Sequence, residues 1–184
     1  MLRYSHRRAI VVLGLVALLV AGIVSAGSSD AASKTKKLHG KMENIHNTHT
    51  VGVPLPFGPE DPGCLSATAV CSRFTARGDI KGDGLVFIDT FPNNDSPSYS
   101  KAHTTIVTKK GTLRCHEAAL FDLQGEDHAF VDECIIDGGT GIYEGATGYI
   151  QEVGTFDFDA NVGELEYVGK ITYADKKSVG ELDD

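Results

Sequence analysis

The sequence has no excess of positive charge, and this property already narrows its function. Its 184 residues include 17 Lys and Arg against 25 Asp and Glu, a formal net charge of -8. A general nucleic-acid binder needs a basic face that replaces the counterions of the phosphates. We therefore expect no nucleic-acid partner. Apolar residues at 41% and charged residues at 23% are typical of a packed globular protein and exclude a disordered chain.

The sequence also lacks the short motifs of several common enzyme classes. It contains no GxSxG nucleophile motif, no CxxC redox pair, no P-loop and no dinucleotide-binding fingerprint. No segment shows a long helical period. Any chemistry must therefore be argued from individual side chains on a predominantly β structure.

One apolar run stands near the N-terminus. Residues 9–24 carry no charge, follow Arg3, Arg7 and Arg8, and lead into Val24-Ser25-Ala26. This order is typical of a secretory signal peptide, which we predict to span residues 1–26. As a helix the run is about 24 Å long, shorter than the ~30 Å hydrocarbon core, so an uncleaved membrane anchor is the weaker alternative. We expect a secreted protein, extracellular or periplasmic, without stable membrane insertion. Cleavage removes three arginines and changes the net charge from -8 to -11.

Export indicates how the four cysteines are used. An even number of cysteines in an oxidising compartment favours disulfides, and metal binding is the poorer alternative because there is no CxxC pair. The connectivity Cys64–Cys71 and Cys115–Cys134 closes the two short loops. We predict these two bonds.

The domain organisation follows from the distribution of apolar segments. Residues 27–63 have no sustained period of 2 or 3.6 and predict a flexible N-terminal arm, and residues 176–184 predict a polar tail. His46 and His49 in the arm would form a metal pair on a helix, but solvated histidines are the more economical interpretation. Between these ends, residues 64–175 predict one β-domain. Its expected strands are 72–81, 85–91, 102–109, 112–123, 126–136, 149–158 and 164–173. Such a series predicts a sandwich or a closed barrel.

The hairpin over residues 112–136 can be placed in register from a two-residue turn at Gln124-Gly125. Counting outward, Cys115 then lies opposite Cys134, close enough for a disulfide. The remaining predicted pairs are Leu123 with Glu126, Phe121 with His128, Ala119 with Phe130 and Glu117 with Asp132. A one-residue slip would destroy the cysteine match, so the match supports both the register and the bond.

The last hairpin is predicted with a four-residue loop at residues 159–162. This loop pairs Phe158 with Gly163, Phe156 with Leu165, Gly154 with Tyr167, Glu152 with Gly169, and Ile150 with Ile171. One face of each hairpin is mostly apolar and is expected to point inward. The polar residues on these inward faces are Glu117, His128, Asp132, Glu152 and Tyr167, and Asp89 is a further inward candidate.

Two segments resemble a known superfamily. The block GGTGIYEGATGY at residues 138–149 and the segment GDGLVFIDTFPNNDSPSYSKAHT at residues 82–104 resemble the allene oxide cyclase-like and dirigent-like barrels, over about residues 71–173. The resemblance implies an all-β fold, an eight-stranded antiparallel barrel with a central cavity, often assembled as a homotrimer. It also implies small hydrophobic ligands handled without metal or organic cofactor. Plant cyclases close a ring in a fatty-acid epoxide, and dirigent proteins steer the coupling of phenoxy radicals.

The candidate site comes from the residues themselves, since no catalytic motif of that superfamily is matched. Carboxylates in a low-dielectric cavity have raised pKa values and can act as general acid or base. We assign this role to Glu152, Glu117 and Asp132, with His128 or Tyr167 as hydrogen-bond partner or proton shuttle. The alternatives are acids at a wet rim and acids bonded to buried backbone.

Three functions are compatible with this pattern. The first is a secreted barrel that binds a small hydrophobic or aromatic metabolite and isomerises or cyclises it by acid–base chemistry. The second is a non-catalytic, dirigent- or lipocalin-like binding protein, and the third is a structural or interaction scaffold. Apolar residues on the expected outer face, namely Leu120, Val131, Val153 and Val168, predict a contact with a partner subunit.

Overall fold

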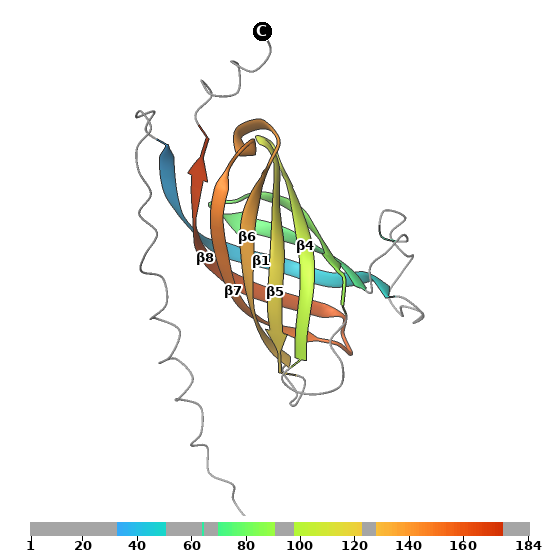
Figure 1. Ribbon diagram of the computed structural model, residues 1–184. Coiled ribbons are helices and arrows are strands. Elements are labelled where there is room, and N and C mark those ends of the chain that lie inside the picture. The colour runs from blue at the N-terminus through green and yellow to red at the C-terminus, as the bar shows by residue number, and fades with distance from the viewer. Residues whose placement is uncertain (1–32, 51–63, 65–69, 91–97, 123–127, 175–184) are drawn as a thin grey trace, which may run out of the picture. The chain divides into compact units, whose positions relative to one another are not determined.

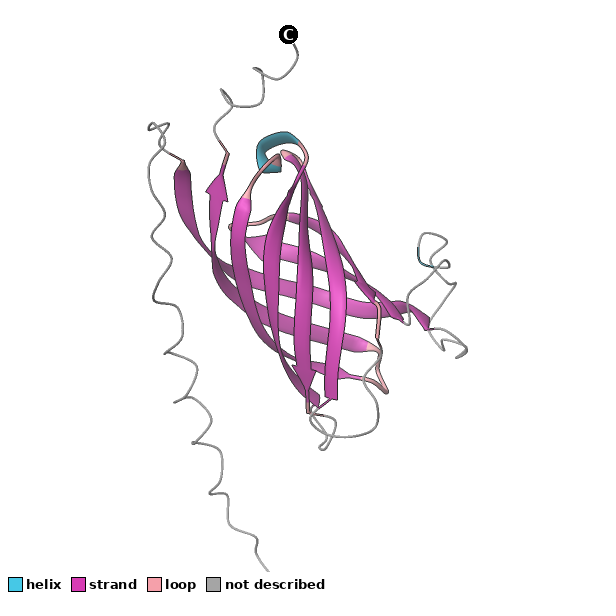
Figure 2. Ribbon diagram, in the orientation of Figure 1, coloured by secondary structure: helices cyan, strands magenta, loops and turns pink. Residues whose placement is uncertain are grey.

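The computed structural model describes residues 33–50, 64, 70–90, 98–122 and 128–174, which form a closed antiparallel barrel (Figure 1). Its elements are β1 Lys34–Thr50, β2 Val70–Gly78, β3 Gly82–Ile88, β4 Ser98–Thr108, β5 Gly111–Phe121, β6 His128–Gly139, the 3-10 helix η2 Gly141–Tyr143, β7 Thr147–Asp157 and β8 Val162–Tyr173 (Figure 2). Each strand pairs with the next, and β8 pairs with β1. The predicted all-β, eight-stranded barrel is confirmed. The predicted signal peptide and polar tail lie outside the described residues.

Strand β1 corrects the predicted arm, because residues 34–50 belong to the barrel and close it between β2 and β8. Their apolar pattern is hidden by an irregularity: Leu38, Met42 and Ile45 are all buried, but the last two lie three residues apart instead of four. Asn44 between them has a positive φ of 55°, and the register shifts at this point in both pairings. Such a bulge interrupts the alternation on which strand prediction depends.

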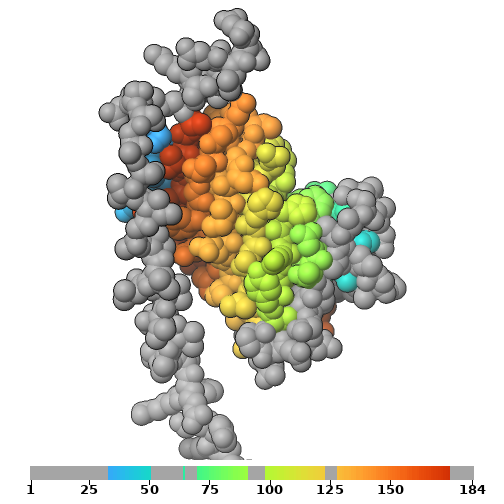
Figure 3. Space-filling model, viewed as in Figure 1, coloured from blue at the N-terminus to red at the C-terminus, as the bar shows by residue number. Residues whose placement is uncertain are grey.

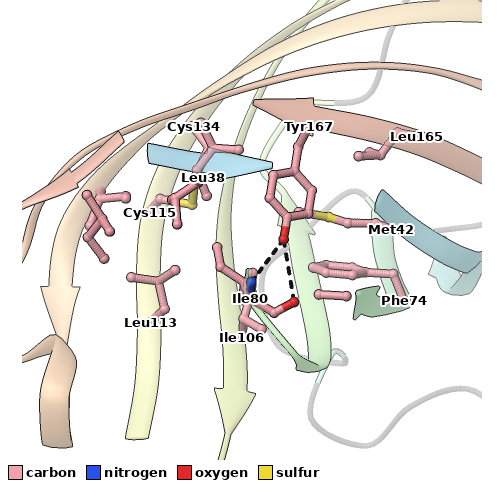
Figure 4. Close-up of a cluster of buried hydrophobic side chains, with 14 of the residues drawn as sticks. Leu38, Met42, Phe74, Ile80, Ile106, Leu113, Cys115, Cys134, Leu165 and Tyr167 are labelled. Carbon is pink, nitrogen blue, oxygen red and sulfur yellow. Dashed lines mark hydrogen bonds between the residues drawn. A yellow bond between two sulfur atoms is a disulfide. The ribbon is translucent and has the colours of Figure 1, made fainter. Parts of the chain in front are cut away.

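The barrel has two different ends, which we call the loop end and the turn end. The loop end joins β1 to β2, β3 to β4, β5 to β6 and β7 to β8. The turn end joins β2 to β3, β4 to β5 and, through η2, β6 to β7. Apolar side chains pack the interior towards the turn end (Figure 4); they include Leu38, Ala76, Ile80, Ile106, Leu113, Ile136, Ile150 and Ile171.

Tyr167 ties this packed region together. Its hydroxyl accepts from the amide of Ile80 at 3.0 Å and lies 3.4 Å from the carbonyl oxygen of the same residue (Figure 4). It also donates to the carbonyl of Arg77 at 3.0 Å, so β8 is bonded to the β2–β3 turn. Gly40 makes room for it, because a Cβ there would lie 2.4 Å from the tyrosine hydroxyl. The inward apolar residues and this bond therefore pack the interior at the turn end.

The predicted register of β5 and β6 is wrong by two residues. Phe121 lies opposite Phe130, Ala119 opposite Asp132 and Glu117 opposite Cys134. The hairpin closes where the amide of Asp122 donates to the carbonyl of Ala129 at 2.8 Å, so the connection is longer than the expected two-residue turn. The Phe121 and Phe130 rings stack in this register, with centroids 5.3 Å apart.

Both predicted disulfides are nevertheless present, and no free cysteine remains. Cys115 and Cys134 lie diagonally across β5 and β6, with Cα atoms 5.5 Å apart. A diagonal pair is therefore close enough to bridge, and the cysteine match alone did not determine the register.

The register of β7 and β8 differs by two residues as well. Gly163 lies opposite Phe156, and Tyr167 lies opposite Glu152. The connecting residues are 158–161, where Asp157 accepts a hydrogen bond from the amide of Ala160 at 2.8 Å and Asn161 has a φ of 52°. This local turn chemistry starts the loop one residue earlier than predicted. A two-residue shift keeps every side chain on its face, so the inward set is preserved.

The glycine-rich block forms the connection between β6 and β7. Gly138, Gly139, Gly141, Gly145 and Gly148 all have positive φ angles, which disfavour other residues. A Cβ on Gly139 would lie 1.7 Å from the carbonyl oxygen of Thr112. Within the part of the chain described, no helix is long and apolar enough to cross a membrane.

Candidate functional site

The barrel interior contains a cavity of about 80 Å³ on the loop-end side of the apolar packing. Its walls come from all eight strands and are mainly apolar. The lining residues are Met42, Ile45, Asn47, Val70, Ser72, Phe74, Val86, Ile88, Ser100, Ala102, Glu117, Ala119, Phe121, Phe130, Asp132, Glu152, Phe156, Phe158 and Leu165. The predicted central cavity is therefore present, and a small ligand of mostly apolar character fits this lining.

Three carboxyl groups meet in this cavity: Glu117 on β5, Asp132 on β6 and Glu152 on β7. We call them the carboxyl cluster. One oxygen atom from each lies within 4.8 Å of the other two. Glu117 is 8% exposed and Glu152 is 6% exposed. Asp132 lies directly opposite Glu152 and one step diagonally from Glu117, so the cluster is a row across three adjacent strands.

The local sequence explains why these acids point inward. On β5 the buried positions alternate as Leu113, Cys115, Glu117 and Ala119, and Glu152 occupies the same kind of position between Ile150 and Gly154 on β7. Since side chains of a strand alternate between its faces, an acid in the apolar phase must enter the interior. The predicted inward orientation of all three acids is correct.

Burial dominates the electrostatics of the cluster. It raises the pKa of Glu117 well above its usual value, and the charge of Asp132 raises it further. Burial likewise raises the pKa of Glu152, followed by the charges of Glu117 and Asp132. The pKa of Asp132 rises, again through burial, from 3.8 to about 6, while hydrogen bonds from backbone amides and from Glu117 lower it.

The hydrogen bonding of the carboxyl cluster is incomplete. Glu117 bonds with Asp132, and Asp132 also bonds with the backbone at Ala118 and Glu133. Oδ1 of Asp132 and Oε1 of Glu152 are buried without a hydrogen-bond partner among the described residues. A buried carboxyl oxygen without a partner is costly, and a ligand that donates a hydrogen bond would remove the cost.

Tyr167 and His128 are not brought into the cluster. Tyr167 faces inward opposite Glu152, but its hydroxyl is bonded to Arg77 and Ile80 at the turn end, and its pKa is raised by burial. His128 begins β6, four residues and thus about 13 Å along the strand from Asp132. Its ring packs edge-on against Phe158, with centroids 4.9 Å apart. The geometry assigns Tyr167 a structural contact and places His128 at the loop end.

The structure corrects the orientation considered for Asp89. Its side chain is 53% exposed and lies 3.7 Å from Nδ1 of His103 on the outer wall, so the expected inward orientation is wrong. Asp89 follows the last residue of β3 and has left the alternation of that strand.

Polar residues that sequence reasoning did not single out also line the cavity. Ser72 donates to the side chain of Asn47 at 2.6 Å, and Asn161 exchanges two hydrogen bonds with the backbone of Asn47, at 2.9 and 3.0 Å. This bonding holds β1 to the β7–β8 loop after the bulge at Asn44. No sequence signal marks it, because Asn and Ser are also ordinary loop residues.

The carboxyl cluster is also the set of described residues that could hold a hard cation. A second grouping of Glu117 with Cys115 and Cys134 is unsuitable, since both sulfur atoms are in a disulfide. Chemically, the cluster can donate and accept hydrogen bonds, exchange protons or neutralise a positive charge.

Comparisons with known proteins find only weak similarity, to solved structures. No family model matches the chain, and no curated protein matches it. Among solved structures, the pterocarpan synthase dirigent protein GePTS1 has 16% identity over 86% of this chain and 100% of that chain, with a TM-score of 0.34. The pterocarpan synthase dirigent protein PsPTS1 has 16% identity over 77% and 97%, with a TM-score of 0.32. The fold is defined by the strand order itself, a closed barrel of eight antiparallel strands.

Proposed function

We propose that this protein is an exported barrel that binds a small hydrophobic or aromatic molecule in its cavity. The observation that carries the proposal is the contrast between apolar walls and three buried carboxyl groups at one place. Apolar walls hold the body of a ligand, and a few convergent polar groups orient it. The unpartnered Oε1 of Glu152 is the atom that a ligand donor would reach.

Retained ligand is the direct test. Native mass spectrometry of the protein purified from its producing organism should show an added mass that is released on unfolding. An Ala102→Phe variant fills the cavity from β4 and should lose that mass while keeping a cooperative thermal transition. An unchanged mass shift in this variant, or no shift in the native protein together with no binding of small apolar probes, would overturn the proposal.

A second candidate function is acid–base catalysis, as a cofactor-independent isomerase or cyclase. The specific observation is the hydrogen-bonded pair of Glu117 and Asp132, in which burial raises the pKa of both acids, that of Asp132 to about 6. Such a pair can donate and accept protons near neutral pH. For a catalyst, Glu152→Gln should abolish turnover of the retained molecule and leave its affinity within about tenfold. For a binding protein, only the affinity or stability should change.

Export and assembly complete the proposal. The two disulfides favour an oxidising compartment.

A row of directly paired apolar residues crosses the outer wall from β4 to β7, and each is about half exposed: Tyr99, Leu120, Val131 and Val153. This wall faces the viewer in Figure 3. We assign it to the contact between subunits of a homotrimer.

A further inference from the structure

The charged groups that line the cavity are all acidic. Its described lining contains the three carboxyl groups and no Lys, Arg or His. The interactions that shift the pKa of Glu152 are burial and the charges of Glu117 and Asp132, so no cation compensates this acid. Buried carboxylates are ordinarily paired with a positive group. We therefore expect the bound ligand to supply the positive group.

Aromatic rings surround the same space. Phe121 and Phe130 stack with centroids 5.3 Å apart, and Phe156 and Phe158 pack with centroids 4.9 Å apart. All four rings line the cavity. The face of an aromatic ring attracts a cation, and the attraction is largest where water is excluded. Rings and carboxylates together favour an ammonium group over a neutral donor.

The connections at the loop end are also more acidic than those at the turn end. The loop-end connections, residues 51–69, 89–97, 122–127 and 158–161, contain eight Asp and Glu and no Lys, Arg or His, and His128 begins β6 at the same end. The turn-end connections, residues 79–81, 109–110 and 140–146, contain two acids and three lysines. The cavity lies on the loop-end side of the packed core. Acidic surroundings raise the local concentration of cations and repel anions.

We propose that the ligand is a small organic cation, a primary amine on an apolar or aromatic body, with its ammonium group held by Glu152, Asp132 and Glu117. This inference rests on the proposed binding function and adds the ligand class. An ammonium nitrogen supplies three donors, which matches three carboxyl groups including the unpartnered Oε1 of Glu152. The cavity of about 80 Å³ limits the body to roughly one small ring or a short branched chain. Free fatty acids and other carboxylates are disfavoured by like charge.

The test is a matched series of probes that differ only in the polar group. Benzylamine, benzyl alcohol and benzoate are titrated into the purified protein by calorimetry, with thermal shift as a second readout. We expect the amine to bind at least about tenfold more tightly than the alcohol, and benzoate not to bind. If the alcohol binds as well as the amine, the cation is wrong while the apolar binding site stands. If none of the three binds and the protein retains no ligand from its source, the proposed function fails as well.

Variants assign the effect to the carboxyl cluster. The triple variant E117Q/D132N/E152Q keeps side-chain volume and should lose the preference for benzylamine, with benzyl alcohol affinity changed less than about threefold. Glu166→Gln on the outer wall is the matched control and should leave the preference intact. Titrations with Ca²⁺ and Mn²⁺ complete the set. Stabilisation by either metal that the triple variant abolishes, without any response to benzylamine, would overturn the amine in favour of a metal site.

Discussion

Replacing Glu152 with Gln should make the ligand-free protein more stable, although most substitutions of buried residues destabilise. The change keeps the volume of the side chain and removes one of three buried acids. Its amide is uncharged at every pH and can donate a hydrogen bond to the neighbouring carboxyl oxygens, whereas the native acid repels them once it is ionised. The gain should depend on pH, because the cost of the native cluster depends on protonation.

The magnitude follows from the geometry. Two unit charges 4.8 Å apart, the limit that encloses the cluster oxygens, repel by about 3 kcal/mol at an effective dielectric constant of about 20. We therefore expect Glu152→Gln to raise the free energy of unfolding by about 2–3 kcal/mol at pH 8.

The sign of the pH dependence is determined by the direction of the shifts. All three acids have raised pKa values in the folded state, so the folded protein binds protons more tightly than the unfolded chain. Their contribution to stability is complete below about pH 4, near the unfolded pKa values, and is lost as the pH rises through the folded values. At pH 4 the substitution should therefore change the free energy of unfolding by less than about 1 kcal/mol.

Urea denaturation of both proteins at pH 4, 6 and 8 measures this difference. Comparing the two proteins at each pH cancels contributions from exposed groups that both share. Glu166→Gln, an exposed acid on the neighbouring strand, should show no comparable gain at any pH. A Glu152→Gln variant that is less stable than the native protein at pH 8, or that gains equally at pH 4 and pH 8, would refute the reasoning.

Two further predictions concern the turn end and the outer wall. Tyr167→Phe leaves two buried backbone groups without their hydrogen-bond partner and should cost about 2 kcal/mol in urea denaturation, with probe affinity unchanged; a loss of binding at unchanged stability would contradict its structural role. The paired substitutions Leu120→Asp and Val131→Asp should convert the proposed trimer to monomers in light scattering, and a native protein that is already monomeric at micromolar concentration would remove the trimer.

The alternation of side chains made the fold and the inward acids predictable, but it could not determine register. Both hairpin registers are wrong by two residues, because loop length depends on turn contacts such as that between Asp157 and the amide of Ala160. The inward face survived since an even shift preserves it. Strand β1 was missed for a different reason: the bulge at Asn44 moves Ile45 into the wrong phase for a simple period of two.

The candidate site could be predicted only in part. Glu117 and Glu152 were recognisable because each interrupts an apolar face. The separation of Tyr167 from the cluster was not, since it depends on the distant β2–β3 turn that receives the hydroxyl. Asn47 and Ser72 could not be predicted, because the hydrogen bond between them forms only when β1 is part of the barrel. Site residues whose position depends on the alternation within one strand could thus be predicted from the sequence. Those whose position depends on long-range contacts could not.

The hydroxyl of Tyr167 also bears on how the protein tolerates change. By bonding β8 to the β2–β3 turn over Gly40 of β1, it acts as a cross-brace that links β8, β1 and β2 at one end of the barrel. This bond at the turn end does not involve residues of the cavity wall, such as Val86, Ala102 and Phe158. Substitutions at those positions can reshape the cavity without the frame being rebuilt. A scaffold braced in this way is a suitable starting point for directed evolution of new binding specificities.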